Sequence, residues 1–227
     1  MIFFDIDGTL LDHEQAERLG AIEFYHRNYN KLKIQEDKFI RLWNQLSIKY
    51  FKRYVANDIT FQQQRQMRIK ELFGQHLTNQ QADEKFNDYL TSYKNNWKAY
   101  DDVIPCLNKL KALKIRLGII SNGEFEQQID KLKSMNILHY FECVITSSTV
   151  GVSKPNTEIF TEACRQANVR LDASYYVGDV IETDVIGSCN SGMKGVWLNR
   201  KRRTISKQLN LVEIHNLSAL MDVLSNS

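Results

Sequence analysis

From residue 105 onward the chain alternates between helix-like and strand-like segments, and this alternation limits the possible folds more than any other feature. Helix-like patterns begin this region at 105–113 and end it at 218–224. Between them lie hydrophobic runs typical of buried strands, at 116–121, 143–146, 174–178 and 195–198. One more such run, at 2–5, opens the chain. Alternation of this kind is typical of parallel sheets whose two faces are covered by helices. The sequence therefore predicts an α/β fold with a Rossmann-like parallel sheet of five strands.

The long segment 14–100 has a different pattern and is interpreted as a helical insertion. It contains no proline, and Trp43 and Tyr50 belong to an apolar stripe at helical spacing. Because the first strand must join the later ones in one sheet, both ends of the insertion must lie near the end of that strand. We therefore expect residues 1–13 and 101–227 to form the core domain and residues 14–100 an all-helical cap domain that closes over the site. Trp43 and Tyr50 could stack on a ring of the substrate, but packing inside the cap is the favoured interpretation.

Two acids follow the first strand-like run. Asp5 and Asp7 are two residues apart, and Gly8 and Thr9 come directly after them. Residues i and i+2 of an extended chain point the same way, so both carboxylates would face one site at the carboxyl edge of the sheet. Two carboxylates held so close repel each other unless a cation lies between them or one carries a proton. The pattern favours a nucleophile and metal ligand at Asp5 and a general acid/base at Asp7.

Three later segments place further polar residues at strand ends or helix starts. Ser121 ends a strand before a helix and could hold a phosphate there, although capping of that helix is the alternative. Lys154 precedes Pro155, and a proline suits the first position of a helix. Lys154 could neutralise developing charge, or it could be an ordinary surface lysine. Asp179 ends another strand. Asp184 follows in the first turn of a helix, where an acid also favours the helix dipole.

In this order, the four segments resemble the motifs of the haloacid dehalogenase-like (HAD) superfamily, and the match extends over the whole chain. The motif residues are Asp5-Ile6-Asp7-Gly8-Thr9, Ser121, Lys154, and Gly178-Asp179 with Asp184. The resemblance implies a HAD fold for the core and a C1 cap for residues 14–100. It also implies a phosphatase, because phosphatases of the superfamily keep the second acid of the first motif, here Asp7, and its dehalogenases lack that acid.

For such a phosphatase the resemblance implies phosphoryl transfer through an aspartyl-phosphate. Asp5 would be the nucleophile, and Asp7 would protonate the leaving oxygen and then deprotonate the attacking water. Mg²⁺ would be bound by Asp5, the Asp7 carbonyl and Asp179. Asp184 would orient Lys154 or a metal-bound water. The residues expected to bind the phosphoryl group are Thr9, Ser121, Asn122 and Lys154.

The substrate is inferred from weaker similarities. Segments 42–43, 59–60, 119–123 and 150–156 look like those of bacterial pyrimidine 5′-nucleotidases, which implies a nucleoside 5′-monophosphate as substrate. A phosphoglycolate or sugar-phosphate phosphatase is the main alternative, because the core chemistry would be the same. A non-catalytic binding protein is disfavoured, since such a protein would be expected to have lost Asp5, Asp7 or Lys154. A mutase is disfavoured because the cap shows no obvious acid/base pair.

The composition excludes several classes of partner. The net charge is only +3 and the basic residues are dispersed, which argues against binding to a nucleic-acid polymer. The basic run Lys201-Arg202-Arg203 is interpreted as a solvated loop, or else as a surface that attracts anionic substrates. No stretch approaches the ~20 apolar residues of a membrane span, and no basic leader precedes the first apolar run. We therefore expect a cytoplasmic monomer or homodimer, with no membrane contact, that acts on a small phosphorylated metabolite.

Cysteines and histidines give no sign of another metal centre. The cysteines are scattered without CxxC spacing and are interpreted as small buried hydrophobes in a reducing compartment. They are Cys106, Cys143, Cys164 and Cys189. The histidines share no metal-ligand spacing, and His13 is the only one close to the expected site.

Overall fold

The computed structural model describes residues 1–204 and 211–225, and the chain divides into two compact units. The first unit contains residues 1–12 and 98–227, and the second contains His13–Trp97. The chain therefore leaves the first unit after Asp12 and returns to it at Lys98. Among the helices of the described ranges, none combines the length and the apolar character that crossing a membrane requires.

The first unit is built on a parallel sheet, which has six strands within the described residues. Its strands are β1 (Ile2–Phe4), β2 (Leu117–Ser121), β3 (Cys143–Thr146), β4 (Tyr175–Gly178), β5 (Lys194–Leu198) and β6 (Val212–Ile214). They lie in the order β3-β2-β1-β4-β5-β6, and every neighbouring pair is parallel. The predicted α/β fold with a Rossmann-like parallel sheet is confirmed.

The expectation of five strands is wrong, because β6 adds a sixth at one edge. It pairs with β5 through Val196 with Val212 and Leu198 with Ile214. The strand has only three residues, and two of them are exposed. It therefore lacks the buried hydrophobic run that identifies the other strands in the sequence.

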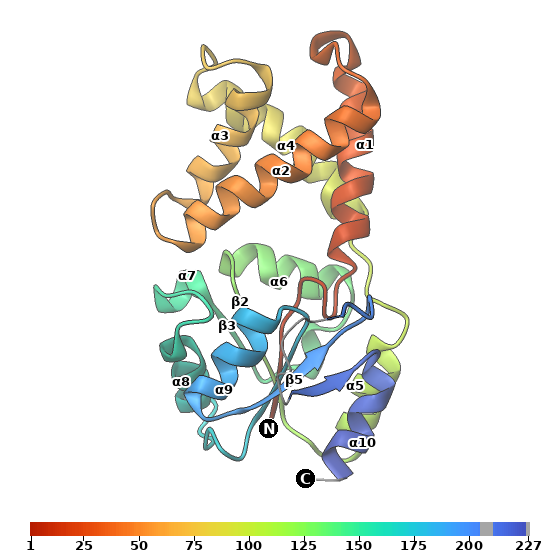
Figure 1. Cartoon of the computed structure of the whole chain (residues 1–227), viewed down its shortest axis with the longest axis vertical. Coiled ribbons are helices and arrows are strands. Elements are labelled where there is room, and N and C mark those ends of the chain that lie inside the picture. Colours follow the sequence, from red (N-terminus) through yellow and green to blue (C-terminus); the bar gives the residue numbers. More distant parts are fainter. Residues whose placement is uncertain (205–210, 226–227) are drawn as a thin grey trace. The chain divides into compact units, whose positions relative to one another are not determined.

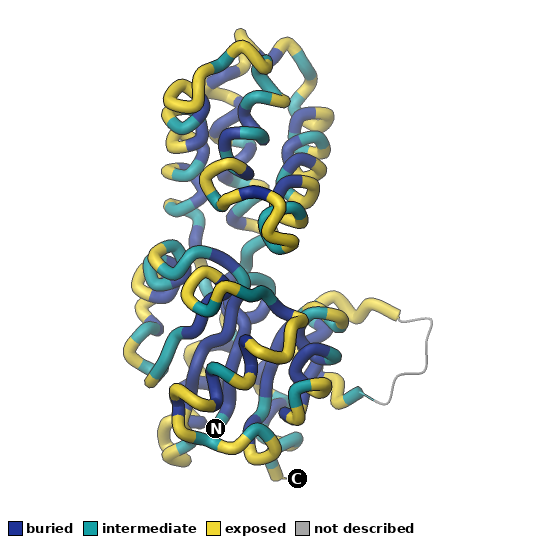
Figure 2. Tube along the Cα trace, turned by 90° about the vertical axis from the view of Figure 1, so that its left-hand side faces the viewer, coloured by how far each residue is buried: buried dark blue, intermediate teal, exposed yellow. Residues whose placement is uncertain are grey.

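Helices cover both faces of this sheet (Figure 1). On one side lie α8 (Thr157–Gln166) and α9 (Gly187–Ser191), and on the other lie α5 (Val103–Ala112) and α10 (Leu220–Ser225). α6 (Phe125–Ser134) connects β2 with β3. The shorter segments are η1 (Leu138–Tyr140), α7 (Ser147–Val150), η2 (Ile181–Ile186) and η3 (Leu217–Ala219). The strands consequently form the buried layer of this unit, as the burial colours in Figure 2 show.

The second unit is helical throughout. Its helices are α1 (His13–Leu32), α2 (Glu36–Val55), α3 (Phe61–Phe73) and α4 (Asn79–Asn95). Two of them begin with capping boxes: Thr60 accepts a bond from the Gln63 backbone at the start of α3, and Thr78 does the same with Gln81 at α4. These caps explain why turns interrupt the helical pattern at those points.

The aromatic side chains of the second unit pack against one another. Trp43 is 1% exposed, and its ring centroid lies 4.5 Å from that of Tyr89 and 5.4 Å from that of Phe24. Tyr50 is also buried, in a cluster with Leu46 and Ile59. The interpretation of Trp43 and Tyr50 as packing residues is therefore confirmed, and neither presents an open ring face for a substrate.

Three minor expectations from the sequence concern the cysteines, His13 and the basic run 201–203. Three of the cysteines are buried or half-buried, but Cys189 is exposed, so the expectation of buried thiols is wrong at that position. His13 belongs to the helical unit, where its Nδ1 lies 2.8 Å from the Tyr93 hydroxyl. The basic run 201–203 lies in an exposed segment outside helices and strands, as expected for a solvated loop.

Candidate active site

The carboxyl edge of the sheet brings the ends of three strands together. β1 lies between β2 and β4, and the chain switches direction across the sheet at this point. Asp5 follows β1, Ser121 ends β2, and Asp179 follows β4. Open α/β sheets bind ligands at the carboxyl edge next to such a switch point. The strand order therefore places three predicted site residues at the expected position.

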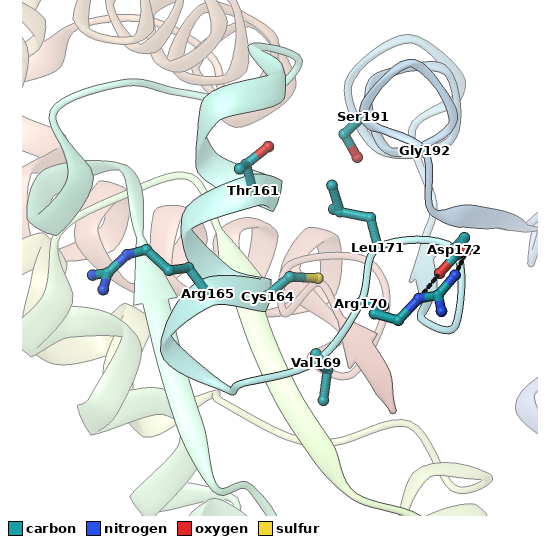
Figure 3. A pocket seen from close by; sticks show the side chains of 9 residues that line it. All are labelled: Thr161, Cys164, Arg165, Val169, Arg170, Leu171, Asp172, Ser191 and Gly192. Carbon is teal, nitrogen blue, oxygen red and sulfur yellow. Dashed lines mark hydrogen bonds and ion pairs between the residues drawn. The ribbon is translucent and has the colours of Figure 1, made fainter.

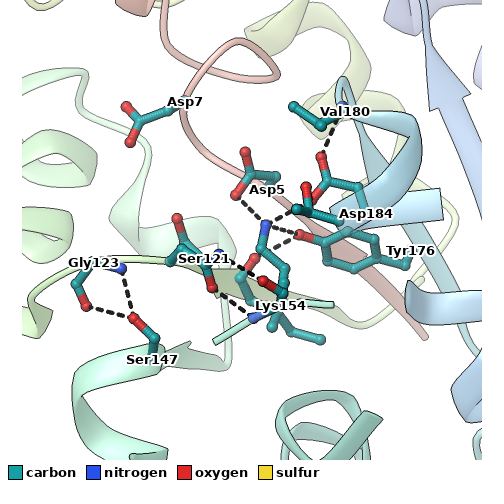
Figure 4. A network of polar contacts seen from close by, with 12 residues as sticks. Asp5, Asp7, Ser121, Gly123, Ser147, Lys154, Tyr176, Val180 and Asp184 are labelled. Carbon is teal, nitrogen blue, oxygen red and sulfur yellow. Dashed lines mark hydrogen bonds and ion pairs between the residues drawn. The ribbon is translucent and has the colours of Figure 1, made fainter. Parts of the chain in front are cut away.

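Lys154 is the centre of a buried polar network at this edge (Figure 4). Its Nζ donates to Asp5 Oδ1 at 2.7 Å, to Asp184 Oδ1 at 2.8 Å and to the Tyr176 hydroxyl at 2.7 Å. The Tyr176 hydroxyl donates in turn to the Ile120 carbonyl at 2.7 Å. Burial by itself lowers the pKa of Lys154, but the charges of Asp184 and Asp5 outweigh it and raise that pKa above its usual range. Lys154 therefore remains an ammonium group, and it is not the surface lysine of the alternative interpretation.

The loop that carries Lys154 is fixed by Asn122. The Asn122 Oδ1 accepts from the Lys154 backbone N–H at 2.8 Å, and its Nδ2 donates to the Lys154 carbonyl at 3.1 Å. The Asn122 side chain thus holds the lysine loop. The expectation that Pro155 occupies the first position of the next helix is wrong, because α8 begins at Thr157, with Asn156 as its N-cap.

Three acids form a cluster that suits a divalent cation. Asp5, Asp179 and Asp184 each offer an oxygen within 4.8 Å of the others. Burial, partly opposed by Lys154, raises the pKa of Asp5 to about 6, and burial followed by the charges of Asp5 and Asp184 raises the pKa of Asp179 to about 8. The Oδ1 of Asp179 is buried and has no hydrogen-bond partner among the described residues. A cation between these oxygens would relieve the repulsion, and a donor set made only of oxygen suits Mg²⁺.

The individual acids of this cluster have different surroundings. Asp184 uses Oδ1 to accept from Lys154 and Oδ2 to accept from the Val180 backbone N–H at 3.0 Å. Both of its oxygens are therefore engaged, as expected of a residue that orients Lys154. Asp5 and Asp179 are the acids better placed to bind a cation directly.

Two glycines allow these acids to approach the backbone. Gly8 has a φ of +83°, and a Cβ there would lie 2.6 Å from Asp179 Oδ2. At Gly178, a Cβ would lie 2.4 Å from the Cβ of Asp184. Separations this short are sterically forbidden, so the glycines of both motifs are required for the acids to occupy their positions.

Asp7 lies apart from the acid cluster, and Figure 4 shows its carboxylate directed away from Asp5 and Lys154. Both of its oxygens accept from the Lys131 Nζ, at 2.8 and 2.7 Å. The Nε2 of Gln128 lies 3.4 Å from Asp7 Oδ2. Lys131 and Gln128 belong to α6 and were not predicted as site residues. Their signal in the sequence is a polar pair three residues apart on a helix that follows Ser121.

Ser121 and Thr9 occupy different environments. The Ser121 hydroxyl accepts from Gln128 Nε2 at 2.7 Å, whereas the N-cap of α6 is Glu124, so the interpretation of Ser121 as a helix cap is wrong. Thr9, predicted to bind the phosphoryl group, is fully buried. Its carbonyl accepts from the Arg200 Nη2 at 2.8 Å. The Thr9 hydroxyl Oγ1 is buried and has no hydrogen-bond partner among the described residues. Its contact with the phosphoryl group stays a prediction.

Arg200 is a further residue near the first motif whose contacts the sequence did not reveal. Its guanidinium donates to both oxygens of Asp102 at 2.9 Å and lies over the Tyr100 ring, 3.9 Å from the centroid. The Asp12 backbone N–H donates to the Lys98 carbonyl at 2.9 Å in the same region. Arg200 thus ties the first motif loop to the segment that returns from the helical unit.

A separate concavity lies at the opposite, amino edge of the sheet (Figure 3). It is lined by residues from the end of α8, the loop before β4 and the end of α9, including Cys164, Leu171 and Ser191. Its guanidinium groups are paired nearby, Arg165 with Glu162 and Arg170 with Asp172. None of the predicted site residues lines this concavity.

Comparisons with known proteins identify several relatives by sequence. A glyceraldehyde 3-phosphate phosphatase of Methanopyrus kandleri is 39% identical over 103 residues, which cover 45% of this chain and 44% of that protein. N-acylneuraminate-9-phosphatase of Mus musculus is 27% identical over 208 residues, covering 89% of this chain and 83% of that protein. A pyrimidine 5′-nucleotidase of Escherichia coli is 34% identical over 111 residues, covering 47% of this chain and 49% of that protein. For the first two relatives found, the match spans only 44% and 59% of their own length.

Solved structures with the same fold cover almost the whole chain. A magnesium-bound HAD-hydrolase from Bacillus subtilis superimposes with a TM-score of 0.82 at 19% identity and covers 99% of this chain and 97% of its own. A HAD phosphatase from Thermococcus onnurineus gives 0.70 at 28% identity, covering 98% and 96%. A 2-haloacid dehalogenase from Pseudomonas syringae gives 0.72 at 26% identity, covering 99% and 97%.

A family model matches most of the chain. The model of the haloacid dehalogenase-like hydrolases matches residues 2–198, which include every predicted site residue from Asp5 to Asp184. The fold of the core, the order of its motifs and this match lead to one conclusion. The chain belongs to the haloacid dehalogenase-like hydrolase family.

Proposed function

We propose that this chain is a Mg²⁺-dependent phosphomonoester hydrolase that works through an aspartyl-phosphate on Asp5. The observation that carries the proposal is the convergence of Asp5, Asp179 and the Lys154 ammonium group in one buried cluster at the switch point of the sheet. A phosphoryl group that enters there would meet a carboxylate nucleophile beside a fixed positive charge. Positioning and charge stabilisation of this kind account for most of the catalysis of phosphoryl transfer.

The chemistry proceeds in two steps on the residues of the site. The Asp5 carboxylate attacks phosphorus in line, so that a bond from Asp5 oxygen to phosphorus forms while the bond to the ester oxygen breaks. Asp7 gives its proton to the leaving oxygen and then takes a proton from the water that attacks phosphorus, which releases phosphate and restores the Asp5 carboxylate. Lys154 and the Ser121 hydroxyl would hold the phosphoryl oxygens where charge accumulates. Mg²⁺, bound by Asp5 and Asp179 together with the Asp7 carbonyl, would supply further positive charge there.

Asp7 also favours a phosphatase over a dehalogenase. One structural neighbour is a 2-haloacid dehalogenase, so the fold does not separate the two activities. A dehalogenase needs a nucleophilic Asp5 but no acid for its leaving group, because halide departs as an anion. The acid at position 7 is what a phosphatase requires and what dehalogenases of the superfamily lack.

We also assign the role of cap to His13–Trp97. The two chain segments that join it to the core are hydrogen-bonded to each other directly after the first motif. The Tyr100 N–H donates to the Leu10 carbonyl at 3.1 Å, and the Asp12 N–H donates to the Lys98 carbonyl at 2.9 Å. A unit rooted within a few residues of Asp7 is suited to exclude water from the site and to contact the leaving group.

For the substrate, a pyrimidine nucleoside 5′-monophosphate is proposed from the similarity of cap and core segments to nucleotidases. The Escherichia coli pyrimidine 5′-nucleotidase supports this proposal, although the match covers only 47% of this chain. A sugar phosphate is the second candidate. It is supported by relatives that are matched along most of their length. These include an N-acylneuraminate-9-phosphatase and a glyceraldehyde 3-phosphate phosphatase of Pyrococcus furiosus. The burial of Trp43 and Tyr50 removes the aromatic faces that would have supported base stacking.

The test is a substrate panel with and without Mg²⁺. We would measure kcat/KM for UMP, dTMP, AMP, phosphoglycolate, glucose phosphates, glyceraldehyde 3-phosphate, N-acylneuraminate 9-phosphate and a 2-haloacid. The proposal expects Mg²⁺-dependent release of phosphate and no release of halide. If a sugar phosphate or phosphoglycolate exceeds every nucleotide by about tenfold or more, the nucleotidase assignment is wrong and the phosphatase assignment stands. Absence of phosphate release from all these esters would refute the phosphatase assignment.

A further inference from the structure

Two buried polar side chains on α6 contact the site without belonging to any predicted motif. Gln128 is 1% exposed and Lys131 is 2% exposed. Lysine is almost never buried to this extent unless it is paired, because an unpaired ammonium loses its hydration. The two residues are three positions apart, so they lie on the same face of the helix. The side chains they contact are Asp7 and Ser121.

Lys131 fixes the orientation of Asp7. Its Nζ contacts both carboxylate oxygens, at 2.8 and 2.7 Å, and the Asp7 side chain is 26% exposed while that of Lys131 is 2% exposed. A two-point contact with a buried partner prevents the carboxylate from rotating freely. In-line attack by Asp5 puts the leaving oxygen on the far side of phosphorus, and the Asp7 carboxylate points away from Asp5 in Figure 4. Lys131 therefore fixes the direction of the Asp7 carboxylate, which we take to be the side of the leaving oxygen.

Gln128 determines the direction in which the Ser121 hydroxyl can donate a hydrogen bond. The Gln128 Nε2 lies 2.7 Å from Ser121 Oγ and 3.4 Å from Asp7 Oδ2. Asp7 Oδ2 is the acceptor for the Lys131 ammonium group, so the amide beside it presents its nitrogen to Asp7 and also to Ser121. Ser121 then accepts from Gln128, and its hydroxyl makes no other hydrogen bond to the described residues. Its hydrogen is thereby left to donate to a phosphoryl oxygen.

We propose that Lys131 and Gln128 are positioning residues on one face of α6. Lys131 orients the acid/base Asp7, and Gln128 orients the Ser121 hydroxyl that binds the phosphoryl group. The proposal rests on the proposed phosphatase function. It assigns Lys131 to the proton-transfer side of the reaction and Gln128 to the binding of the phosphoryl group, so the two residues should have different kinetic signatures.

The distinguishing property for Lys131 is the dependence of the rate on the leaving group. An alkyl phosphate releases an alkoxide, which needs a proton from Asp7, whereas p-nitrophenyl phosphate releases an anion that is stable without one. The ratio kcat/KM reports only the steps up to cleavage of the ester bond, so the later attack of water does not mask this difference. Loss of a residue with a purely structural role would reduce kcat/KM for the alkyl ester and for p-nitrophenyl phosphate by the same factor.

The experiment compares Lys131→Met, Lys131→Arg and the control Lys133→Met in the full chain, with p-nitrophenyl phosphate and the best alkyl phosphate of the panel. Lys133 lies on the same helix but is exposed. For Lys131→Met we expect kcat/KM to fall about 10- to 100-fold for the alkyl ester and less than about threefold for the aryl ester. Lys131→Arg should recover part of the loss, and Lys133→Met should match the wild type. Equal losses for both esters, or no loss in a natively folded variant, would overturn the assignment of Lys131.

Gln128→Leu provides an independent arm because it leaves the contact between Lys131 and Asp7 in place. It should lower kcat/KM equally for both esters and weaken inhibition by inorganic phosphate by about threefold to tenfold. Unchanged inhibition by phosphate would overturn the role of Gln128. If Lys131→Met loses its native circular dichroism, Lys131→Gln gives the same comparison, and unfolding of both would mark the pair as structural and refute the proposal. A wild type that hydrolyses neither ester would instead refute the phosphatase function itself.

Discussion

Replacement of Lys154 by methionine tests the electrostatic design of the site. Methionine has nearly the length of the lysine stem but lacks its charge. The change removes the ammonium group that contacts Asp5 at 2.7 Å and Asp184 at 2.8 Å, in a place where the Lys154 side chain is only 3% exposed. Two buried carboxylates are then left without their cation.

The expected loss of stability follows from this burial. Removal of one partner from a buried ion pair typically costs about 3–5 kcal/mol, because the charge left behind has neither water nor a partner. A buried carboxylate can relax by taking up a proton, so we expect the lower part of that range, about 3 kcal/mol. For a chain of this size such a loss corresponds to a decrease in Tm of roughly 6–12 °C. Further replacement of Asp184 by asparagine should recover part of the loss, since it removes one of the two unpaired charges.

The assay is chemical denaturation of the wild type, Lys154→Met and the control Lys133→Met, each in EDTA and in excess Mg²⁺. Lys133 is exposed, so the control should change the free energy of unfolding by less than about 0.5 kcal/mol. A cation in the acid cluster replaces part of the missing charge, so Mg²⁺ should stabilise Lys154→Met more than it stabilises the wild type. If Lys154→Met is as stable as Lys133→Met in EDTA, or if Mg²⁺ affects all proteins equally, the electrostatic account is refuted.

Three further predictions address other parts of the molecule. EDTA should abolish phosphatase activity and Mg²⁺ should restore it, whereas Ca²⁺ should substitute poorly because its larger, looser shell misplaces the ligands; activity that survives thorough chelation contradicts the metal site. Gly178→Ala should destabilise the protein by about 1–3 kcal/mol and reduce kcat, because a Cβ there would lie 2.4 Å from the Cβ of Asp184; a fully active, stable variant would show that the packing is misassigned. Trp43→Ala should cost about 3–5 kcal/mol of stability and leave the ratios of kcat/KM among substrates unchanged; a changed substrate preference would place Trp43 at the site.

The sequence predicted those site residues whose positions follow from the topology of a parallel sheet. Asp5, Ser121 and Asp179 each lie at the end of a hydrophobic run, and adjacent parallel strands must bring such residues to one edge. The glycine before Asp179 was equally visible, because it interrupts a strand pattern. Lys154 was predicted from its position in the order of motifs, and its burial could not be read from the sequence.

The residues that the sequence missed act through contacts between distant elements. Tyr176 resembles any core aromatic of a strand, and only the folded structure shows its hydroxyl between Lys154 and the Ile120 carbonyl. Lys131 lies 124 residues from Asp7 in the chain, so no local pattern could indicate their contact. The burial of Thr9 could not be read from the sequence either, because it depends on how the loop of the first motif folds onto the core.

The central claim is that Asp5 becomes phosphorylated during turnover, and trapping of that intermediate tests it most directly. Wild type and Asp5→Asn would be mixed with a ³²P-labelled phosphomonoester and Mg²⁺, quenched in acid, and analysed for label on the peptide that contains residue 5. We expect acyl-phosphate label on the wild type and none on Asp5→Asn, whose turnover should fall by roughly 10³-fold or more. Label on another residue, or near-normal turnover of Asp5→Asn on p-nitrophenyl phosphate, would contradict the covalent mechanism.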